Sequence, residues 1–277
     1  MNNQAQRVVA VLLSTYNGDR YIEEQLVSLL DQRCDDMVVH IRDDGSSDST
    51  IQIIEAYQAR YPEVFRVYRG DNLGSSLSFY WLLQNVEADY YFFCDQDDIW
   101  RCDKLVLHLA RFSDEISPQM VFSDLDILQS NDDAPSLTLL SMQKKDPMFL
   151  IKSPVRLLCQ NPVAGCAMSI NRSAKDAVMA IGCPPVGIVH DHWISVIVAI
   201  FGQIRFVTEN LVYYRLHASN QIGSQAFDLL YVFKKLAKLR STLIYDLRFL
   251  GALPEDQRPS LAMYGRVKLM TNLRRLF

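Results

Sequence analysis

The chain has 277 residues, a net charge of −4 and 49% hydrophobic residues. This apolar fraction excludes a largely disordered chain, and the length suits one α/β domain with appended elements. No apolar run reaches the roughly 18 residues that a membrane-spanning helix requires, and "MNNQAQR" is too polar for a secretory signal. The six cysteines show neither a CxxC pair nor zinc-finger spacing. We therefore expect a cytoplasmic protein whose cysteines are reduced core residues.

Charge is distributed unevenly along the chain. Residues 226–277 hold ten Lys or Arg and four Asp or Glu, a net +6, whereas residues 1–225 carry −10. An acidic body argues against nucleic-acid binding, while a basic tail can approach an anionic surface.

Strand and helix patterns alternate through the first 124 residues. Buried strands are predicted at 8–13, 37–42, 64–69, 90–95 and 119–124. Helical spacing of apolar residues predicts a helix after each of the first four strands, with faces at Ile22, Leu26, Leu29 and Leu30, at Ile51, Ile54, Tyr57 and Tyr61, within "LSFYWLLQNV", and at Leu105, Leu109 and Phe112. Such alternation with short connections indicates a mostly parallel, Rossmann-like sheet flanked by helices on both faces.

Polar turns follow the first four strands. They read "STYN", "DDGSSD", "DNLGSS" and "DQDD". Ligands of parallel α/β sheets bind outside the carboxyl ends of the strands, so we expect all four turns to line one edge.

The pattern changes after residue 125. Residues 126–150 are predicted to be irregular, "NPVAGCAMSINR" to be a loop feeding a strand, and "HDHW" to precede a helix with Ile194, Ile197, Val198 and Phe201 on one face. "QIRFVTENLVYYRLH" predicts two short strands, and the last 50 residues are predicted to be helical, with an apolar stripe at Phe233, Leu236, Leu243, Leu247 and Leu250.

The "DQDD" turn places carboxylates at the end of an apolar strand. Asp95 and Asp97 have the D-x-D spacing, which lets two carboxylates in a turn face one divalent cation. Oxygen ligands of this kind suit Mg²⁺ or Mn²⁺ together with substrate phosphates. The alternative is a solvated acidic turn, and the position at the end of a buried strand, before Trp100, favours the cation site.

The "RDDGSSDST" turn also offers paired carboxylates. Asp43 and Asp44 end a strand and could accept hydrogen bonds from a base imide or from ribose hydroxyls, although the following serines and Asp48 are also good helix caps. Tyr16 could stack on a base or belong to the core. The first turn lacks both the G-x-G-x-x-G fingerprint and the P-loop GK[ST], which disfavours nicotinamide and P-loop phosphate chemistry.

Together, "VLLSTYNGDRYIEEQLVSLLDQ", "IRDDGSSDST", "DNLGSSLSF" and "YYFFCDQDDIW" resemble the nucleotide-binding half of the family 2 glycosyltransferases, which have the GT-A fold. The resemblance is strong over residues 8–112. It continues through "NPVAGCAMSINR", "VHDHW" and "YYRLHASN", which look most like rhamnosyltransferase-type enzymes of bacterial O-antigen and capsule synthesis. It implies a GT-A domain over residues 1–225, with a nucleotide-binding half 1–125 and an acceptor-binding half 126–225, followed by a helical, basic extension 226–277.

The resemblance implies roles for individual residues. Asp191 matches the family's general base, and Asp97 would bind the metal together with Asp95, which also contacts ribose. Trp100 and His192 are expected at the acceptor. The other implied positions are Thr15, Tyr16, Asn17, Asp43, Asp44 and Asn72 for the donor nucleotide, Arg215 and His217 for the diphosphate, and Gly165 and Trp193 for the acceptor.

The implied reaction transfers a sugar, with inversion, from a nucleoside diphosphate to an acceptor hydroxyl, with Mn²⁺ or Mg²⁺ as cofactor. The resemblance suggests dTDP-rhamnose as donor, with UDP-hexoses left open, and a saccharide acceptor that could be linked to undecaprenyl diphosphate. For Asp191 the alternative role is a helix cap, and Trp193 could simply be a core residue. The basic tail could pack on the body or another subunit, or could lie on the cytoplasmic face of the inner membrane.

Two other functions compete with this one. A sugar nucleotidyltransferase would share the polar strand ends, but its Gly-rich loop with Arg and Lys is missing from "STYNGDR". A non-catalytic nucleotide-sugar or glycan-binding module would need neither Asp97 nor Asp191, and both are present.

Overall fold

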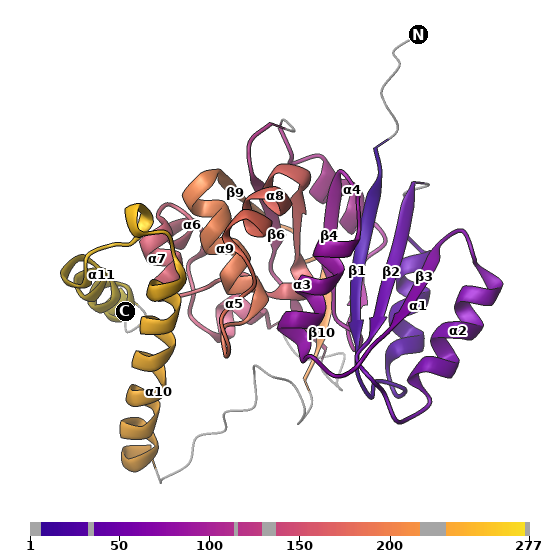
Figure 1. Cartoon of the computed structure of the whole chain (residues 1–277), viewed down its shortest axis with the longest axis horizontal. Helices are drawn as coiled ribbons and strands as arrows, with labels where there is room; N and C mark the ends of the chain where they lie inside the picture. The colour runs from indigo at the N-terminus through magenta and orange to yellow at the C-terminus, as the bar shows by residue number, and fades with distance from the viewer. Residues whose placement is uncertain (1–6, 33–35, 114–115, 129–136, 217–230, 275–277) are drawn as a thin grey trace.

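The computed structural model describes residues 7–32, 36–113, 116–128, 137–216 and 231–274 (Figure 1). The side chains of residues 231–240, among them Phe233 and Leu236 of the apolar stripe predicted for the tail, lie outside the description. The predicted diphosphate ligand His217 and the predicted boundary at 225/226 also lie outside the described residues.

The central sheet has seven strands in the order β3-β2-β1-β4-β8-β6-β9. They are β1 Val9–Thr15, β2 Met37–Asp43, β3 Phe65–Arg69, β4 Tyr90–Cys94, β6 Gln119–Ser123, β8 Met168–Asn171 and β9 Gln203–Val207. All neighbouring pairs are parallel except those of β8, which runs antiparallel to both β4 and β6. The mostly parallel sheet was predicted, whereas the reversed strand was not.

A second sheet of three short strands adjoins the first. It has the order β5-β10-β7, with β5 Ile99–Trp100, β7 Asp126–Leu128 and β10 Val212–Arg215. Because β5 follows the "DQDD" turn directly, this sheet anchors the far side of that turn. The pairing of β5 with β10 brings the C-terminal half of the chain against the turn.

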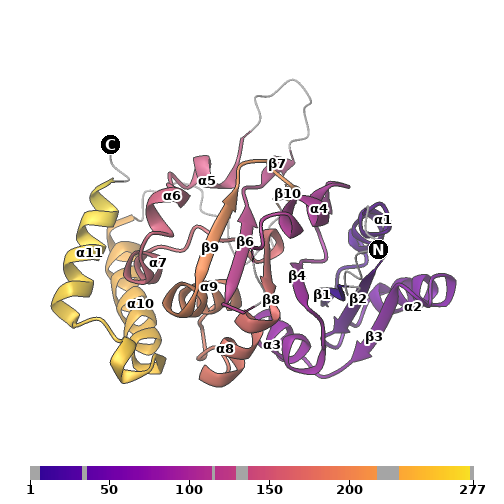
Figure 2. The same cartoon turned by 90° about the horizontal axis from the view of Figure 1, so that it is seen from above.

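Helices cover both faces of the central sheet (Figure 2), and the two largest apolar clusters lie between these helices and the sheet. Alternate side chains of β1 enter opposite cores, as the pleat of a strand requires: Ala10 and Leu12 on one face, Val11 and Leu13 on the other. The helices of the first core include α3 Ser75–Asn85, α8 Arg172–Ile181 and α9 His190–Phe201, and those of the second include α1 Ile22–Leu30, α2 Thr50–Arg60 and α4 Lys104–Leu109.

The segment 126–150 is more regular than predicted. Besides β7 it contains α5 Leu139–Met142 and α6 Pro147–Leu150, and α7 Pro154–Cys159 follows. Thr138 and Asp146 cap the first two helices by accepting hydrogen bonds from backbone N–H groups. Helices of four residues are barely one turn long, so they leave no apolar period in the sequence.

The C-terminal helices α10 Tyr231–Ala252 and α11 Leu261–Arg274 lie at the end of the molecule away from β3 and α2 (Figures 1 and 2). They join the body, because Phe249, Leu253 and Tyr264 are buried in the same core as α9. Of the residues in the predicted stripe, Leu250 is buried, whereas Leu243 and Leu247 are 57% and 49% exposed. None of the described helices is both long enough and apolar enough to cross a membrane.

The cysteine prediction also holds only in part. Cys94 and Cys166 are buried and Cys159 is half-buried, and all the described cysteines are free thiols. Cys102 and Cys183 are exposed, so they do not belong to the core.

Candidate functional site

A cavity of about 640 Å³ lies where the polar turns meet. This volume falls within the roughly 300–1,000 Å³ typical of small-molecule sites. Ten residues predicted for the site line it: Thr15, Tyr16, Asn17, Asp44, Asn72, Asp95, Asp97, Gly165, Asp191 and His192. Each of the four turns contributes, so the prediction that they share one edge is confirmed.

A side chain between the two D-x-D aspartates joins the first and fourth turns. Gln96 accepts a hydrogen bond from the Tyr16 backbone N–H at 2.8 Å and donates to the Tyr16 carbonyl at 3.1 Å. Gly18 leaves room for this clamp, because a Cβ there would lie 2.3 Å from Gln96 Oε1. The ring of Tyr16 itself is 47% exposed at the cavity wall.

Asp43 ties two turns together and does not line the cavity. Its carboxylate accepts from the Thr15 hydroxyl at 3.1 Å and from the backbone N–H and hydroxyl of Ser46 at 2.9 and 2.6 Å. It is 4% exposed, so the predicted contact with the nucleotide is corrected to a structural role.

Asp44 lines the cavity but is already engaged by the protein. The N–H groups of Leu73 and Gly74 donate to its carboxylate at 2.9 and 2.7 Å, and the buried Arg42 guanidinium pairs with it. A carboxylate offers about four acceptor positions, so one further hydrogen bond from a ligand can be accommodated. Arg42 also donates to the Asp71 carbonyl at 2.9 Å and thereby fixes the third turn.

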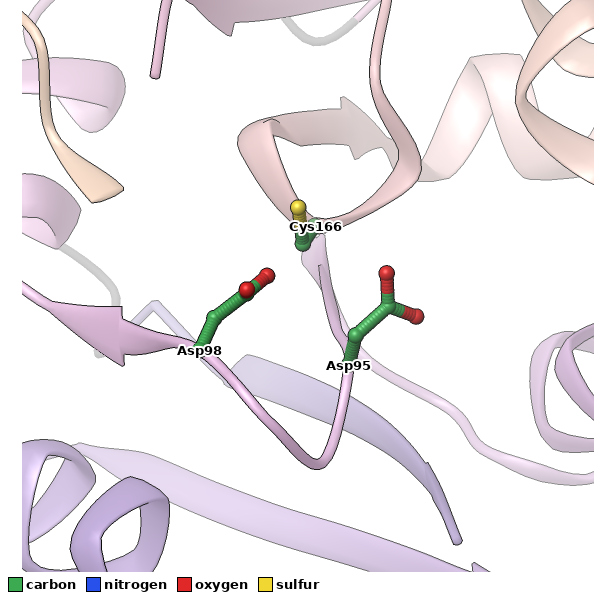
Figure 3. A group of neighbouring side chains, drawn as sticks. All are labelled: Asp95, Asp98 and Cys166. Atoms are coloured by element: carbon green, nitrogen blue, oxygen red, sulfur yellow. The ribbon is translucent and has the colours of Figure 1, made fainter. Parts of the chain in front are cut away.

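The "DQDD" turn concentrates negative charge against a thiol (Figure 3). Oxygen atoms of Asp95 and Asp98 and the sulfur of Cys166 lie within 4.8 Å of one another. Burial, reinforced by the charges of Asp97 and Asp98, raises the pKa of Asp95 well above its ordinary value. Burial and the charge of Asp97 raise the pKa of Asp98 to about 7. Carboxylates that lie this close together repel one another, and a bound cation would relieve that repulsion, so the turn is a potential cation site.

The grouping differs from the predicted D-x-D pair. Asp97 lines the cavity, yet the residues whose ligand atoms converge are Asp95, Asp98 and Cys166. Asp98 Oδ2 is buried and has no hydrogen-bond partner among the described residues. A divalent cation would satisfy that oxygen, so the residues present fit such an ion. Its ligands would come from Asp95 with Asp97 or Asp98, and oxygen ligands favour Mg²⁺ or Mn²⁺.

Asp191 lies in the first turn of α9, with 5% of its surface exposed. It does not cap this helix, because the cap position is Val189. Its carboxylate accepts from the backbone N–H groups of His192 and Gly165. Burial nevertheless raises the pKa of Asp191 to about 6, against the opposing effects of these hydrogen bonds and of Lys145. A carboxylate with such a pKa, at a cavity wall, is suited to accept a proton near neutral pH.

Three predicted acceptor contacts are not supported by the placement of the side chains. Both ring nitrogens of His192 are used, with Nδ1 2.7 Å from the Tyr245 hydroxyl and Nε2 2.9 Å from the Leu157 carbonyl. Trp193 is 1% exposed and donates to the Gly182 carbonyl at 3.0 Å. Trp100 is 3% exposed beneath the "DQDD" turn. We therefore retain only Gly165 among the predicted acceptor residues.

Arg215 lies beside the fourth turn without lining the cavity. Its Nε donates to the Asp97 carbonyl at 3.1 Å, its backbone N–H contacts Asp98 Oδ1 at 3.3 Å, and its guanidinium pairs with Glu24 at 2.8 Å. In the described conformation it therefore supports the turn rather than facing the cavity.

A further part of the cavity wall was not predicted. Gln143, Lys145 and Asn161 line it, and the Lys145 ammonium donates to the Asn161 carbonyl. Gln143 and Lys145 come from the segment 126–150, which was predicted to be irregular, and Asn161 comes from a predicted loop. In neither does a periodic pattern indicate which side chains converge. The polar residue at the start of "NPVAGC" was the only signal available.

Comparison with known proteins identifies the family. Residues 10–176 match the family Glycosyl transferase family 2. The dTDP-rhamnosyl transferase RfbG of Shigella flexneri is 41% identical over 98 residues, which cover 34% of each chain. The putative teichuronic acid biosynthesis glycosyltransferase TuaG of Bacillus subtilis is 34% identical over 98 residues, which cover 35% of this chain and 39% of TuaG. The matched region thus spans little more than a third of these relatives.

Solved structures support the same assignment at the level of fold. TarS 1–349 of S. aureus in complex with UDP-GlcNAc aligns with a TM-score of 0.63 at 19% identity, covering 97% of this chain and 72% of that one. The mannosyltransferase PcManGT of Pyrobaculum calidifontis, in complex with GDP-Man and Mn²⁺, aligns with a TM-score of 0.63 at 13% identity, covering 99% and 74%. With a family match over more than half of its length and this architecture, the chain belongs to glycosyl transferase family 2 and has the GT-A fold.

Proposed function

We propose that the protein transfers a sugar, with inversion, from a nucleoside diphosphate to a hydroxyl of a saccharide acceptor. The observation that carries this proposal is Asp191, a buried carboxylate with a pKa raised to about 6, which lines the same cavity as the acidic fourth turn. A direct displacement needs one base to take the acceptor proton. Asp191 has the position and the proton affinity for that task, which is typically worth about 10²–10⁴ in rate.

The donor would occupy the side of the cavity formed by the polar turns. Tyr16 offers an exposed ring for a base, and Asp44 retains capacity for one more hydrogen bond. A divalent ion held by Asp95 with Asp97 or Asp98 would neutralise charge on the leaving diphosphate. We propose dTDP-rhamnose or a UDP-hexose as donor, which is in keeping with the named activity of RfbG and the UDP-GlcNAc bound to TarS.

The acceptor would approach along the wall formed by Gly165, Lys145 and Asn161. We propose that it is a growing bacterial surface polysaccharide, O-antigen or capsule, and that it is linked to undecaprenyl diphosphate. The names of RfbG and TuaG support this class of product. A lipid-linked acceptor would require the enzyme to work at the cytoplasmic face of the inner membrane.

The outer surface of the C-terminal helices supports such a location. Large apolar side chains are exposed there, namely Leu243, Leu247, Leu269, Met270 and Leu273. Arg266 on α11 is also exposed, whereas Arg274 pairs with Asp146 of the body. Apolar side chains beside Arg suit the boundary between lipid headgroups and acyl chains, where anionic lipids add electrostatic attraction.

The proposed function can be tested with Asp191→Asn, which keeps the size of the side chain but removes the base. Donors are first identified by thermal shift with UDP-, dTDP- and GDP-sugars, in Mn²⁺ and in chelator, because a ligand of the native state raises the melting temperature. With the best donor, we expect kcat to fall by about 10²–10⁴ while donor affinity is nearly retained.

Asp246→Asn is the matched control. Asp246 is similarly buried, at 8% exposure, but pairs with Lys268 on the C-terminal helices away from the cavity. This variant should retain turnover. Full turnover by Asp191→Asn would show that another group takes the proton.

A further inference from the structure

Lys104 is buried completely beneath the fourth turn. It is the first residue of α4 and has 0% exposure. Its ammonium donates to the Cys166 carbonyl at 2.5 Å and lies 3.3 Å from the centre of the Trp100 ring. A lysine is almost never fully buried unless its charge is compensated, because removing the ammonium from water costs free energy. The interactions that compensate Lys104 are therefore informative.

The charge of Lys104 faces the acidic turn. The carboxylates of Asp95, Asp97 and Asp98 belong to the loop between β4 and β5, and the Cys166 thiol that converges with two of them belongs to the residue whose carbonyl Lys104 holds. Lys104 thus hydrogen-bonds to the residue on one side of this convergence, and its charge acts on Asp95 and Asp98 on the other side. It compensates the anionic turn and at the same time fixes the position of the opposite segment.

That opposite segment also holds Asp191. The Gly165 backbone N–H donates to the Asp191 carboxylate, and the neighbouring residue Cys166 is the one bound by Lys104. Gly165 fits closely, because a Cβ at this position would lie 2.6 Å from His190 Nε2. The segment is therefore held by two hydrogen bonds, one from Lys104 and one to Asp191, and it packs closely against the imidazole of His190.

We propose that Lys104 is a positioning residue for the general base. By holding the Cys166 carbonyl, it places the Gly165 N–H where it orients the Asp191 carboxylate relative to the acidic fourth turn. This inference rests on the proposed function, since it assigns a supporting group to the base named there. Lys104 does not line the cavity, so its effect on turnover passes through the 165–166 segment.

Lys104→Met tests the proposal, because methionine fills a similar volume without the charge or the donor. Lys175→Met is the matched control. Lys175 is also buried, donates to the Val86 carbonyl at 2.7 Å and lies 5.4 Å from the Tyr91 ring. Both variants lose a buried lysine bound to a distant carbonyl, but only Lys104 reaches the segment that holds Asp191.

We expect Lys104→Met to lower kcat by about 10²-fold, as expected for a small displacement of a catalytic group, with donor affinity nearly retained. Lys175→Met should lose stability but keep its kcat. Amide hydrogen exchange of the metal-free proteins gives a readout independent of activity: a peptide covering residues 163–167 should exchange faster in Lys104→Met and not in Lys175→Met.

A second variant reaches the same segment without touching the lysine. Gly165→Ala should lower kcat similarly, because the added Cβ would collide with His190 and displace the segment. The double variant should lose little more than either single one, because both changes disturb the same element. If Lys104→Met does not fold, Lys104→Gln, whose side chain is shorter and uncharged, must show the faster exchange of residues 163–167 with donor affinity retained.

Unchanged kcat and unchanged exchange in Lys104→Met, or additive losses in the double variant, would overturn the positioning role. A wild-type protein that binds no nucleotide sugar would instead contradict the proposed function, so the two failures are distinguishable.

Discussion

Asp191 illustrates how burial decides the chemistry of a single residue. Only 5% of its surface is exposed, and desolvation outweighs the hydrogen bonds from His192 and Gly165, so that its pKa rises from 3.8 to about 6. The neighbouring imidazoles respond oppositely, since burial lowers the pKa of His190 to about 3 and that of His192 to about 4. At neutral pH these histidines are uncharged, and Asp191 is the group prepared to take a proton.

The pKa of Asp191 predicts a pH dependence of activity and of stability. We expect kcat to rise with pH through a midpoint near 6, because only the ionised carboxylate accepts a proton. The raised pKa means that the folded state binds more protons than the unfolded state between pH 3.8 and about 6. The contribution of Asp191 to stability is therefore present below this window and is lost as the pH rises through it.

Asp191→Asn removes the buried negative charge that lowers the stability of the wild type above pH 6. The variant should therefore melt about 2–6 °C higher than wild type above that pH. Thermal melts of wild type and variant at pH 4 and pH 7.5 check the sign. A variant that is more stable than wild type only at pH 4 would contradict the raised pKa.

Asp44 combines a structural pair with the nucleotide pocket. Asp44→Ala leaves the buried Arg42 guanidinium without its carboxylate partner, so we expect a loss of about 3–5 kcal/mol in the free energy of unfolding, together with weaker donor binding. Urea unfolding and donor titration measure the two effects. Asp71→Ala, an exposed carboxylate in the adjoining turn, should change stability little. Wild-type stability in Asp44→Ala would mean that the pair contributes nothing.

Among the elements, α9 and α10 connect the site to the tail. Tyr245 of α10 donates its hydroxyl to His192 of α9 at 2.7 Å, and their rings stack with centres 5.7 Å apart. Phe249 packs on both His192 and Trp193. The helix that carries Asp191 is therefore held on its outer side by a helix from the basic tail.

Tyr245→Phe keeps the stacked ring and removes the hydroxyl. We expect a loss of about 1 kcal/mol in unfolding free energy and a several-fold fall in kcat, because His192 adjoins the base. Chemical denaturation and steady-state kinetics measure both. Tyr213→Phe, at a tyrosine that is 39% exposed on β10, serves as control and should match wild type. If Tyr245→Phe and Tyr213→Phe had the same kinetics, the hydroxyl that α10 contributes would have no role in catalysis.

The predictability of these elements depended on what the sequence pattern contains. The first four strand–helix repeats were predicted because their periods are visible in residues 8–112, and the position of the polar turns followed from parallel strands. The reversal of β8 was not predicted, because the direction of a strand leaves no trace in its own residues. Arg42, Lys104 and Lys145 were missed for a related reason: each acts through partners that only the tertiary fold brings near.

At the scale of the whole molecule, the acidic body and the basic tail form one folded unit. Residues 1–225 carry −10 and residues 226–277 carry +6, yet Phe249, Leu253 and Tyr264 of the tail are buried with side chains of α9. The tail thus has an inner face in the core and an outer face with exposed leucines. Removing it would expose that core, so its surface has to be studied with point substitutions.

Paired substitution of Leu269→Glu and Leu273→Glu tests the outer face. We expect wild type to co-sediment with anionic vesicles, more weakly as salt increases, because the attraction is partly electrostatic. The paired variant should remain in the supernatant while its melting temperature is unchanged. Ile116→Glu, at an apolar residue 91% exposed elsewhere, is the control and should sediment like wild type. If the wild-type protein did not co-sediment with either anionic or neutral vesicles, membrane docking would be excluded.

The contact between Tyr245 and His192 has a practical consequence for recombining such enzymes. Exchanging the C-terminal tail of this chain for that of a homologue, to change the surface on which the enzyme docks, also replaces α10. That exchange removes the helix that supports α9, which carries Asp191. In a chimera, α9 and α10 should therefore come from the same parent protein. The junction should be placed before α9 rather than in the segment that precedes α10.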